Sequence, residues 1–218
     1  MIFVNFKTYK EGTGIKAVEL ARDLSSCQSQ AKIPVIPVVQ ATDIRLCVAA
    51  SLYEVWVQHV DPIEYGKNTG WILPEAVTEA GAIGTFLNHS EHKVPDSTLQ
   101  ETLERCKEAG LKVLVFAADI KELEQVVKFK PDYVAYEPPE LVGSTTTSVS
   151  RAKPEIIKEA AEVTKKAGIP LIVGAGVKDS TDVKVSIELG AVGVAVSSAI
   201  VLAENPKKVV LELAEGFE

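Results

Sequence analysis

Three short polar stretches, each directly after an apolar run, carry the side chains that acid–base chemistry requires. They contain Asn5 and Lys7, then His89 and Glu91, and finally Glu137. A partly desolvated carboxylate such as that of Glu137 is suited to remove a proton, and the imidazole of His89 is suited to donate one. A lysine at a buried position requires an anionic partner, which a charged substrate can supply. These residue types indicate proton transfer on a small anion, if the fold brings them together.

Each of these residues also has an ordinary structural interpretation. Lys7 could be a surface lysine beyond the end of a strand. His89 could be a structural histidine, and Glu137 could be a carboxylate in a salt bridge. His59 could form a second polar wall or belong to an interface, and His92 is expected to be exposed. No other strand-like run supplies ligands that would complete a metal site with His89. Nor does the sequence hold a nucleophile elbow, a Walker loop or a dinucleotide-binding glycine motif. We therefore expect neither a metal ion nor a cofactor.

Eight short β-branched runs alternate with amphipathic segments along the whole chain. In order, the runs begin near Ile2, Pro34, Glu54, Gly84, Leu111, Asp132, Pro170 and Gly193. Most are almost continuously apolar, as in residues 113–116 and 171–173. Such runs are typical of strands that are buried on both faces of a parallel sheet.

Start and stop signals predict several of the helices between these strands. The start signals are, in order, Ser97 with Gln100 and Asp119 with Glu122 at capping-box spacing, Pro154, and Asn205 before Pro206. Gly110 and Gly168 stand where a C-terminal glycine is expected. Little of the chain is left over, and no Gly/Ser-rich linker divides it.

Eight βα units in 218 residues predict an α/β protein with a closed (β/α)8 barrel that forms a single domain over residues 1–218. A doubly wound open sheet is the alternative. It usually has fewer strands and often a glycine-rich first turn, whereas residues 5–9 contain no glycine. In a barrel the active site forms at the C-terminal ends of the strands, and all three polar stretches lie at such ends. The barrel is therefore the fold that would gather them.

The composition excludes several classes of partner. Hydrophobic residues make up 46% and charged residues 24% of the chain, and the formal net charge of −7 is spread along it. This balance argues against disorder, and it leaves no basic patch for nucleic acid or an anionic membrane. Three widely spaced cysteines, Cys27, Cys47 and Cys106, fit buried thiols in a reducing compartment. With no basic leader and no apolar run that could span a bilayer, we expect a cytoplasmic protein.

Three motifs together resemble the signature regions of the triosephosphate isomerase family, in the same order. They are Asn5-Phe6-Lys7, Asn88-His89-Ser90-Glu91, and Tyr136-Glu137-Pro138 through Gly143. The resemblance covers nearly the whole chain, and residues 138–143 and the compact length are similar to the archaeal branch. It implies a TIM barrel without a cofactor that interconverts dihydroxyacetone phosphate and D-glyceraldehyde 3-phosphate through an enediolate, in glycolysis and gluconeogenesis.

The resemblance also implies a role for each residue. Glu137 would carry the proton between neighbouring carbons, and neutral His89 would donate to the substrate oxygen. Lys7, with Asn5 beside it, would offset the negative charge, and Glu91 would support the site from behind. Substrate contacts are implied for Asn5, Phe6, Lys7, Val142, Gly143, Gly176, Ser197 and Ser198. Because an enediolate phosphate decomposes in water, residues 138–144 would form a lid over it.

Parts of the sequence depart from the better-known bacterial and eukaryotic pattern. Ser197 and Ser198 stand where a glycine pair is common, Gly176 and Val177 where a Gly-Gly-Ser run is common, and His92 where an arginine is frequent. Backbone amides at the first two places can still bind phosphate. Alternatively, the glycines after the seventh strand only turn the chain.

The loop from residue 61 to 74 is long and carries Tyr65, Gly66, Thr69 and Trp71. Large aromatics on an exposed loop suggest burial against another subunit, and in the family this loop docks into a neighbouring protomer. We therefore expect a homotetramer, otherwise a homodimer. Two rival functions remain at this point: a Schiff-base aldolase with Lys7 as nucleophile, and a non-catalytic protein that binds a phosphorylated ligand.

Overall fold

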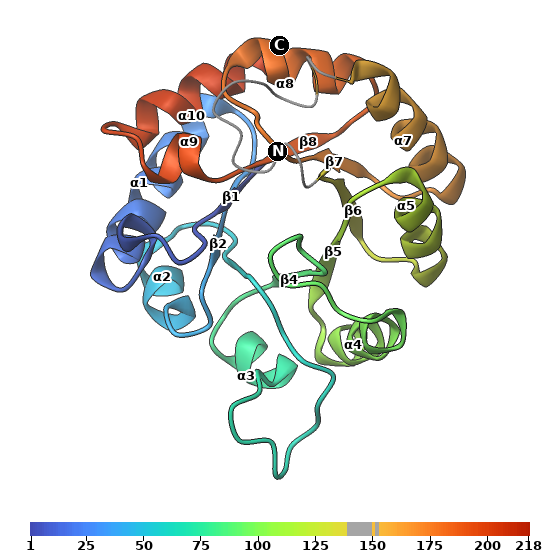
Figure 1. Ribbon diagram of the computed structural model, residues 1–218. Helices are drawn as coiled ribbons and strands as arrows, with labels where there is room; N and C mark the ends of the chain where they lie inside the picture. The colour runs from blue at the N-terminus through green and yellow to red at the C-terminus, as the bar shows by residue number, and fades with distance from the viewer. Residues whose placement is uncertain (139–149, 151–152) are drawn as a thin grey trace.

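The computed structural model describes residues 1–138, 150 and 153–218, and their strands form one closed barrel (Figure 1). The strands are β1 (Ile2–Asn5), β2 (Val35–Val39), β3 (Trp56–Val57), β4 (Gly84–Leu87), β5 (Lys112–Ala117), β6 (Tyr133–Tyr136), β7 (Leu171–Val173) and β8 (Gly193–Val196). All neighbours pair in parallel and in sequence order, and β8 returns to β1 through the pair Ile2 and Val194.

Helices surround this barrel on the outside (Figure 1). They are α1 (Ile15–Ala31), α2 (Ile44–Ala50), α3 (Pro74–Glu79), α4 (Asp96–Ala109), α5 (Ile120–Val126), α7 (Pro154–Ala167), α8 (Ser180–Glu188), α9 (Ser198–Val201) and α10 (Pro206–Ala214). Short 3-10 turns are η1 (Lys10–Gly12), η2 (Val127–Phe129) and η4 (Glu215–Phe217). The predicted (β/α)8 barrel is confirmed, each strand begins within two residues of its predicted start, and the open-sheet alternative is wrong.

The eight strands bury both of their faces, which explains their continuous apolar sequence. Among the described residues, the buried apolar side chains that pack together inside the barrel are Phe3, Ile36, Val38, Trp56, Phe86, Leu114, Phe116, Ala135, Ile172 and Ala195. Alternate residues such as Ile2 and Val4 face the helices instead, because strand side chains alternate between faces. The ring of Trp56 fills the barrel beside Gly84, where an added Cβ would lie 2.4 Å from the ring. Position 84 therefore has no room for a side chain.

The helix starts match the predicted capping signals in three cases and differ in one. Asp119 accepts a hydrogen bond from the Glu122 N–H, Asn205 accepts one from the Lys208 N–H, and α7 begins at Pro154. The prediction that Ser97 caps α4 is wrong, because that helix already begins at Asp96 after Pro95. Proline fixes φ in an extended entry, and the Asp96 carboxylate then lies in the first turn, where the helix dipole favours it.

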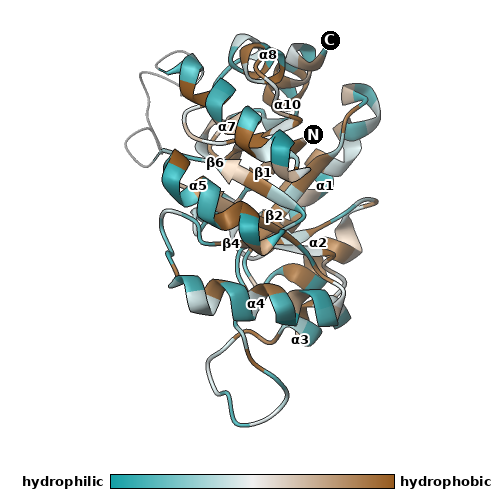
Figure 2. Ribbon diagram, turned by 90° about the vertical axis from the view of Figure 1, so that its right-hand side faces the viewer, coloured by the Kyte–Doolittle hydropathy of each residue, from teal (hydrophilic) through white to brown (hydrophobic). Residues whose placement is uncertain are grey.

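Two further features of the described chain bear on function. The loop from residue 61 to 73 projects from the barrel between β3 and α3, and helices such as α4 carry separate hydrophilic and hydrophobic stripes (Figures 1 and 2). Within the described residues, no helix combines the length and the apolar character that crossing a bilayer would demand.

Candidate active site

A cavity of about 290 Å³ opens at the C-terminal ends of the strands. Its lining includes Asn5, Lys7, His89, Glu137, Gly176, Val177, Lys178, Ser197 and Ser198, and its apolar part includes Phe86, Phe116 and Ala195. Phe86, Phe116 and Ala195 also belong to the barrel interior, so the packed core supports one side of the cavity. Small-ligand pockets of this size typically combine an apolar wall with a few convergent polar groups.

Lys7 reaches the cavity through an unusual backbone turn rather than as a continuation of β1. Its φ of +47° is left-handed, a conformation that is uncommon for residues other than glycine. The Lys7 N–H donates to Asn5 Oδ1 at 3.0 Å, and Gln58 Nε2 donates to the Lys7 carbonyl at 2.9 Å. Lys7 Nζ then donates to Glu91 Oε1 at 2.7 Å. The ammonium is thereby held at the cavity, with a carboxylate partner on its exposed side.

The environment of His89 favours a neutral imidazole with its proton on Nε2. The Glu91 N–H donates to His89 Nδ1 at 3.1 Å, so Nδ1 acts as an acceptor. Burial lowers the pKa of His89, against the opposing effect of the Glu137 and Glu91 carboxylates. The ring packs edge-on against Phe116, with centroids 4.7 Å apart. His89 can therefore donate a hydrogen bond into the cavity without carrying charge.

Glu137 faces His89 across a short gap. Its Oε2 lies 3.2 Å from His89 Nε2 and accepts the Ser90 hydroxyl at 3.1 Å. Only 7% of the residue is exposed, and its N–H is tied to the Ala117 carbonyl of β5. An added Cβ at Gly174 would lie 3.1 Å from Glu137 Oε1, so the backbone directly after β7 passes close beside the carboxylate. Glu137 is thus a nearly buried carboxylate with a fixed backbone, which is the setting of a general base.

The opposite side of the cavity is suited to an anion. Ala175 and Gly176 both have left-handed φ angles, of +70° and +73°. The hydroxyl of Ser197 is buried and has no hydrogen-bond partner among the described residues. Because buried polar groups are normally paired, a substrate oxygen is a natural partner for it.

The structure gathers most of the predicted site residues and separates one of them. Seven line this one cavity together: Asn5, Lys7, His89, Glu137, Gly176, Ser197 and Ser198. Glu91 is joined to the site through Lys7 and His89. The side chain of Phe6 is fully buried in the outer core and does not line the cavity. Val142, Gly143 and the predicted lid beyond Pro138 lie outside the described residues.

Two residues near the cavity were not singled out from the sequence. Ser90 bonds to Glu137, and Lys178 lines the cavity just after Gly176. In the sequence, Ser90 is a hydroxyl inside the His89 motif and Lys178 is a lysine after a glycine turn. These weak signals do not distinguish either residue from an ordinary surface residue.

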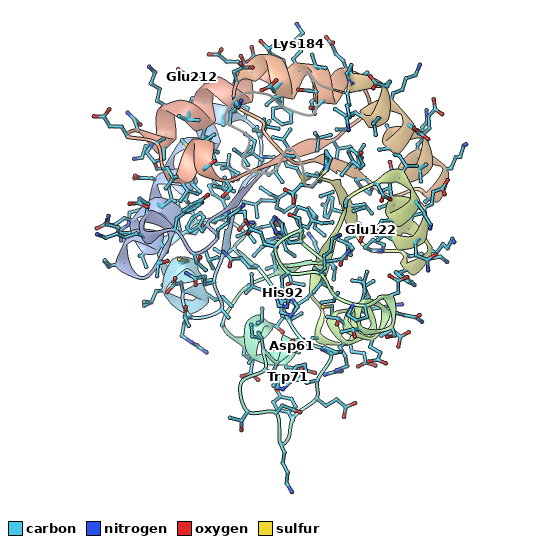
Figure 3. The ribbon with its side chains drawn as sticks, in the orientation of Figure 1. Asp61, Trp71, His92, Glu122, Lys184 and Glu212 are labelled. Atoms are coloured by element: carbon cyan, nitrogen blue, oxygen red, sulfur yellow. The ribbon has the colours of Figure 1, made fainter. Side chains whose placement is uncertain are left out.

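The remaining histidines lie at the base of the β3–α3 loop. His59 Nε2 is 3.1 Å from Asp61 Oδ1, and its ring stacks on His92 with centroids 4.3 Å apart. Asp61 also binds the loop's other end, since its Oδ2 accepts the Ile72 N–H at 2.6 Å. Figure 3 shows His92, Asp61 and Trp71 in this order from the barrel centre towards the loop. His59 and His92 do not line the cavity.

Metal ligands are not grouped in the described part of the chain. No cluster of three or more histidine, cysteine, aspartate or glutamate side chains there could hold a metal ion.

A carboxylate, a neutral imidazole and an ammonium at one cavity define the class of protein: a (β/α)8 barrel equipped for proton transfer on an anion. Comparisons with known proteins make the class specific. The sequence model of the family described as triosephosphate isomerase matches residues 1–215. The chain belongs to the triosephosphate isomerase family, whose members are isomerases.

Three relatives, all named triosephosphate isomerase, are similar to this chain over almost its whole length. The protein of Methanopyrus kandleri is 40% identical, with 100% of this chain and 97% of the relative covered. That of Saccharolobus solfataricus is 39% identical (96% and 92% covered), and that of Methanobrevibacter smithii is 37% identical (98% and 96% covered). The predicted similarity to the archaeal branch is thereby confirmed.

Proposed function

We propose that this protein interconverts dihydroxyacetone phosphate and D-glyceraldehyde 3-phosphate, as a step of glycolysis and gluconeogenesis. The observation that carries the proposal is the separation of 3.2 Å between Glu137 Oε2 and His89 Nε2 at a cavity that Lys7 also lines. A base, a neutral donor and a cation around one small space are what an aldose–ketose isomerisation through an enediolate requires.

The reaction begins with proton removal by Glu137. Its carboxylate takes the proton from the carbon next to the carbonyl, and the electron pair of that C–H bond forms the enediolate. The same carboxylate returns the proton to the former carbonyl carbon. The isomer forms once His89 has donated a proton to the former carbonyl oxygen and recovered one from the neighbouring hydroxyl, whose oxygen becomes the new carbonyl. Ser90 donates to Glu137 Oε2 and so holds the carboxylate in one orientation before substrate arrives.

His89 and Lys7 stabilise the charge that this transfer creates. His89 Nε2–H donates to the carbonyl oxygen, and as a neutral group it can exchange a proton with the enediolate oxygens. Lys7 offsets the charge of the phosphate and the enediolate, with Asn5 holding the Lys7 backbone. Glu91 keeps both partners in place through its N–H and its carboxylate.

The phosphate group is proposed to bind at the loops that follow β7 and β8. Gly176, Ser197 and Ser198 line this side of the cavity. The buried Ser197 hydroxyl has no hydrogen-bond partner among the described residues, so it is free to bind a phosphate oxygen. Lys178 adds a second cation there. Val142 and Gly143 are proposed to complete the contacts, with residues 138–144 as the lid.

An assay coupled to glyceraldehyde 3-phosphate consumption or formation tests the proposal, run in D2O with mass analysis of the product. We expect turnover with incorporation of solvent deuterium at carbon. The Schiff-base alternative predicts a covalent adduct at Lys7 after borohydride treatment with substrate. It is disfavoured because the Lys7 ammonium is ion-paired with Glu91, whereas a nucleophilic lysine must be neutral. A protein that binds phosphates without catalysis would show neither turnover nor deuterium incorporation.

We also infer a homo-oligomer, a homotetramer or otherwise a homodimer, in which the β3–α3 loop docks into a neighbouring protomer. Tyr65 and Trp71 on this loop are 68% and 58% exposed, which is unusual for large aromatics. The pairing of Asp61 with Ile72 closes the base of the loop and gives it a defined shape before docking.

Replacing Trp71 with lysine is expected to shift the protein to smaller species in analytical ultracentrifugation. The new lysine ammonium would have to lose its water shell inside the proposed subunit contact, which costs free energy of association. Leu202→Lys is the matched control, because Leu202 is also an exposed apolar residue but caps the C-terminus of α9, which lies away from the β3–α3 loop (Figure 1). An unchanged sedimentation coefficient for the Trp71 variant would contradict this interface.

A cytoplasmic location and a single functional domain over residues 1–218 complete the proposal. All three cysteines are free and buried, as a reducing compartment allows. Burial raises the pKa of both Cys47 and Cys106 to about 12, so these thiols stay protonated and unreactive. Cell fractionation tests the location.

A further inference from the structure

The segment that carries His89 leaves β4 through a left-handed residue. Asn88 has a φ of +57°, a conformation in which asparagine is enriched among non-glycine residues. Its side chain is buried and makes three hydrogen bonds. Nδ2 donates to the Phe116 carbonyl at 2.9 Å and to Glu122 Oε1 at 2.8 Å, and Oδ1 accepts the Val94 N–H at 3.2 Å. The direction of the adjoining His89 is therefore coupled to the position of the Asn88 amide.

Glu122 is the residue to which this turn is bound. It lies in the first turn of α5, next to the loop that follows β4 (Figure 3). Its Oε1 accepts from Asn88 Nδ2 and from Lys93 Nζ, at 2.8 and 2.7 Å, and its Oε2 accepts from Lys93 Nζ at 2.8 Å. The Ala118 N–H donates to the same Oε2 at 2.6 Å. One carboxylate thus binds both ends of residues 88–93 and the end of β5.

The contacts at Glu122 hold its carboxylate in one place. They are charge-assisted and short, and the side chain is only 28% exposed, so water competes weakly for the carboxylate. The Glu122 N–H is itself held by Asp119 Oδ1 at 2.8 Å, which fixes the backbone from which the side chain extends. Loss of this carboxylate would leave the buried Asn88 Nδ2 with one partner and the Lys93 ammonium with none of these bonds.

We propose that Glu122 is a positioning residue for the isomerase reaction: through Asn88 it sets where the His89 imidazole lies relative to Glu137. This inference rests on the proposed function, because it assigns a task to the same site. Glu122 touches neither the cavity nor Glu137 among the contacts of the described residues, so it acts on the site through the β4–α4 loop and the residue that follows β5 rather than by direct contact.

The test compares Glu122→Gln and Asn88→Gly with the unaltered protein. Glutamine keeps the shape but loses the charge that holds Lys93, and glycine keeps the left-handed φ but loses the amide. Because a displacement of about 1 Å in a reacting group costs about 10²-fold in rate, we expect kcat to fall roughly 10- to 100-fold in each variant. KM and the inhibition constant of inorganic phosphate should change less than about 3-fold, since the phosphate contacts are untouched.

The control and the double variant separate positioning from general damage. Glu124→Gln, an exposed carboxylate two residues further along α5, should behave like the unaltered protein. In the double variant Glu122→Gln/Asn88→Gly, kcat should lie within about 3-fold of the kcat of the slower single variant. The two effects should not multiply, because both changes weaken the same hydrogen bond between Asn88 and Glu122. All assays are run below the thermal midpoint of every variant, and if one variant does not fold, the other decides.

Two outcomes would overturn the inference. In one, kcat stays within 2-fold in a folded variant; in the other, phosphate inhibition weakens as much as kcat falls, which would indicate loosening of the whole site. An unaltered protein without isomerase activity would instead refute the proposed function, so the two failures can be distinguished.

Discussion

Glutamine at position 137 is expected to lower kcat by about 10³- to 10⁴-fold, the upper range for loss of a general base. The amide cannot accept the carbon-bound proton, but it fills the same space and can still accept the Ser90 hydroxyl. Removing a nearly buried charge costs little stability, so the thermal midpoint should change by only a few degrees. Steady-state turnover and a thermal melt of the same preparation measure both quantities.

The Glu137→Gln variant also has a signature at His89. The Glu137 carboxylate raises the pKa of His89 against the lowering effect of burial, so its loss should lower that pKa further. A pH titration of the His89 imidazole by NMR detects the direction. Glu124→Gln serves as a matched control on the surface. Near-normal turnover of the Glu137 variant would show that another group moves the proton.

The second large effect is expected from Lys7→Met, which keeps the length of the side chain and removes its charge. We expect kcat/KM to fall by about 10²- to 10³-fold, as for loss of one preorganised group that stabilises developing charge. The Glu91 carboxylate, now without the 2.7 Å contact to Nζ, would remain beside the site and repel an anionic substrate. The double variant Lys7→Met/Glu91→Gln should therefore recover part of the loss.

Salt dependence provides an independent measurement of the same cation. Binding of a phosphate analogue to the unaltered protein should weaken as ionic strength rises, and Lys7→Met should bind it more weakly with a flatter salt dependence. Lys208→Met, which alters an exposed lysine on α10, is the control. Equal affinity and equal salt slopes in the Lys7 variant and the unaltered protein would remove Lys7 from the substrate site.

Much of the site follows from strand alternation alone. Phe3 points into the barrel, so Asn5 two residues later should do so, and it does line the cavity. The same rule carries Ala135 to Glu137 and Ala195 to Ser197. Where a strand runs straight to its end, the sequence is sufficient to say which side chain faces the substrate.

Strand alternation does not hold at the end of β4, and this exception positions His89, the proposed hydrogen-bond donor to the substrate carbonyl. Phe86 points inward, so alternation predicts an inward Asn88 and an outward His89. The structure has the reverse, with His89 at the cavity and Asn88 bound to the Phe116 carbonyl and Glu122. The left-handed φ of Asn88 reverses the alternation, and its partners lie 28 and 34 residues further along the chain. Local spacing carries no information about such bonds.

The sequence by itself determined the eight strands, their parallel order and the strand ends at which chemistry occurs, because apolar periodicity and capping depend on neighbouring residues. Only the tertiary structure decided which side chain turns inward where the backbone departs from strand geometry. It turned His89 towards the cavity and Asn88 away from it at the left-handed end of β4, and it stacked His59 on His92. These outcomes depend on contacts between elements far apart in the chain, whose free energies exceed the local preferences of the residues involved.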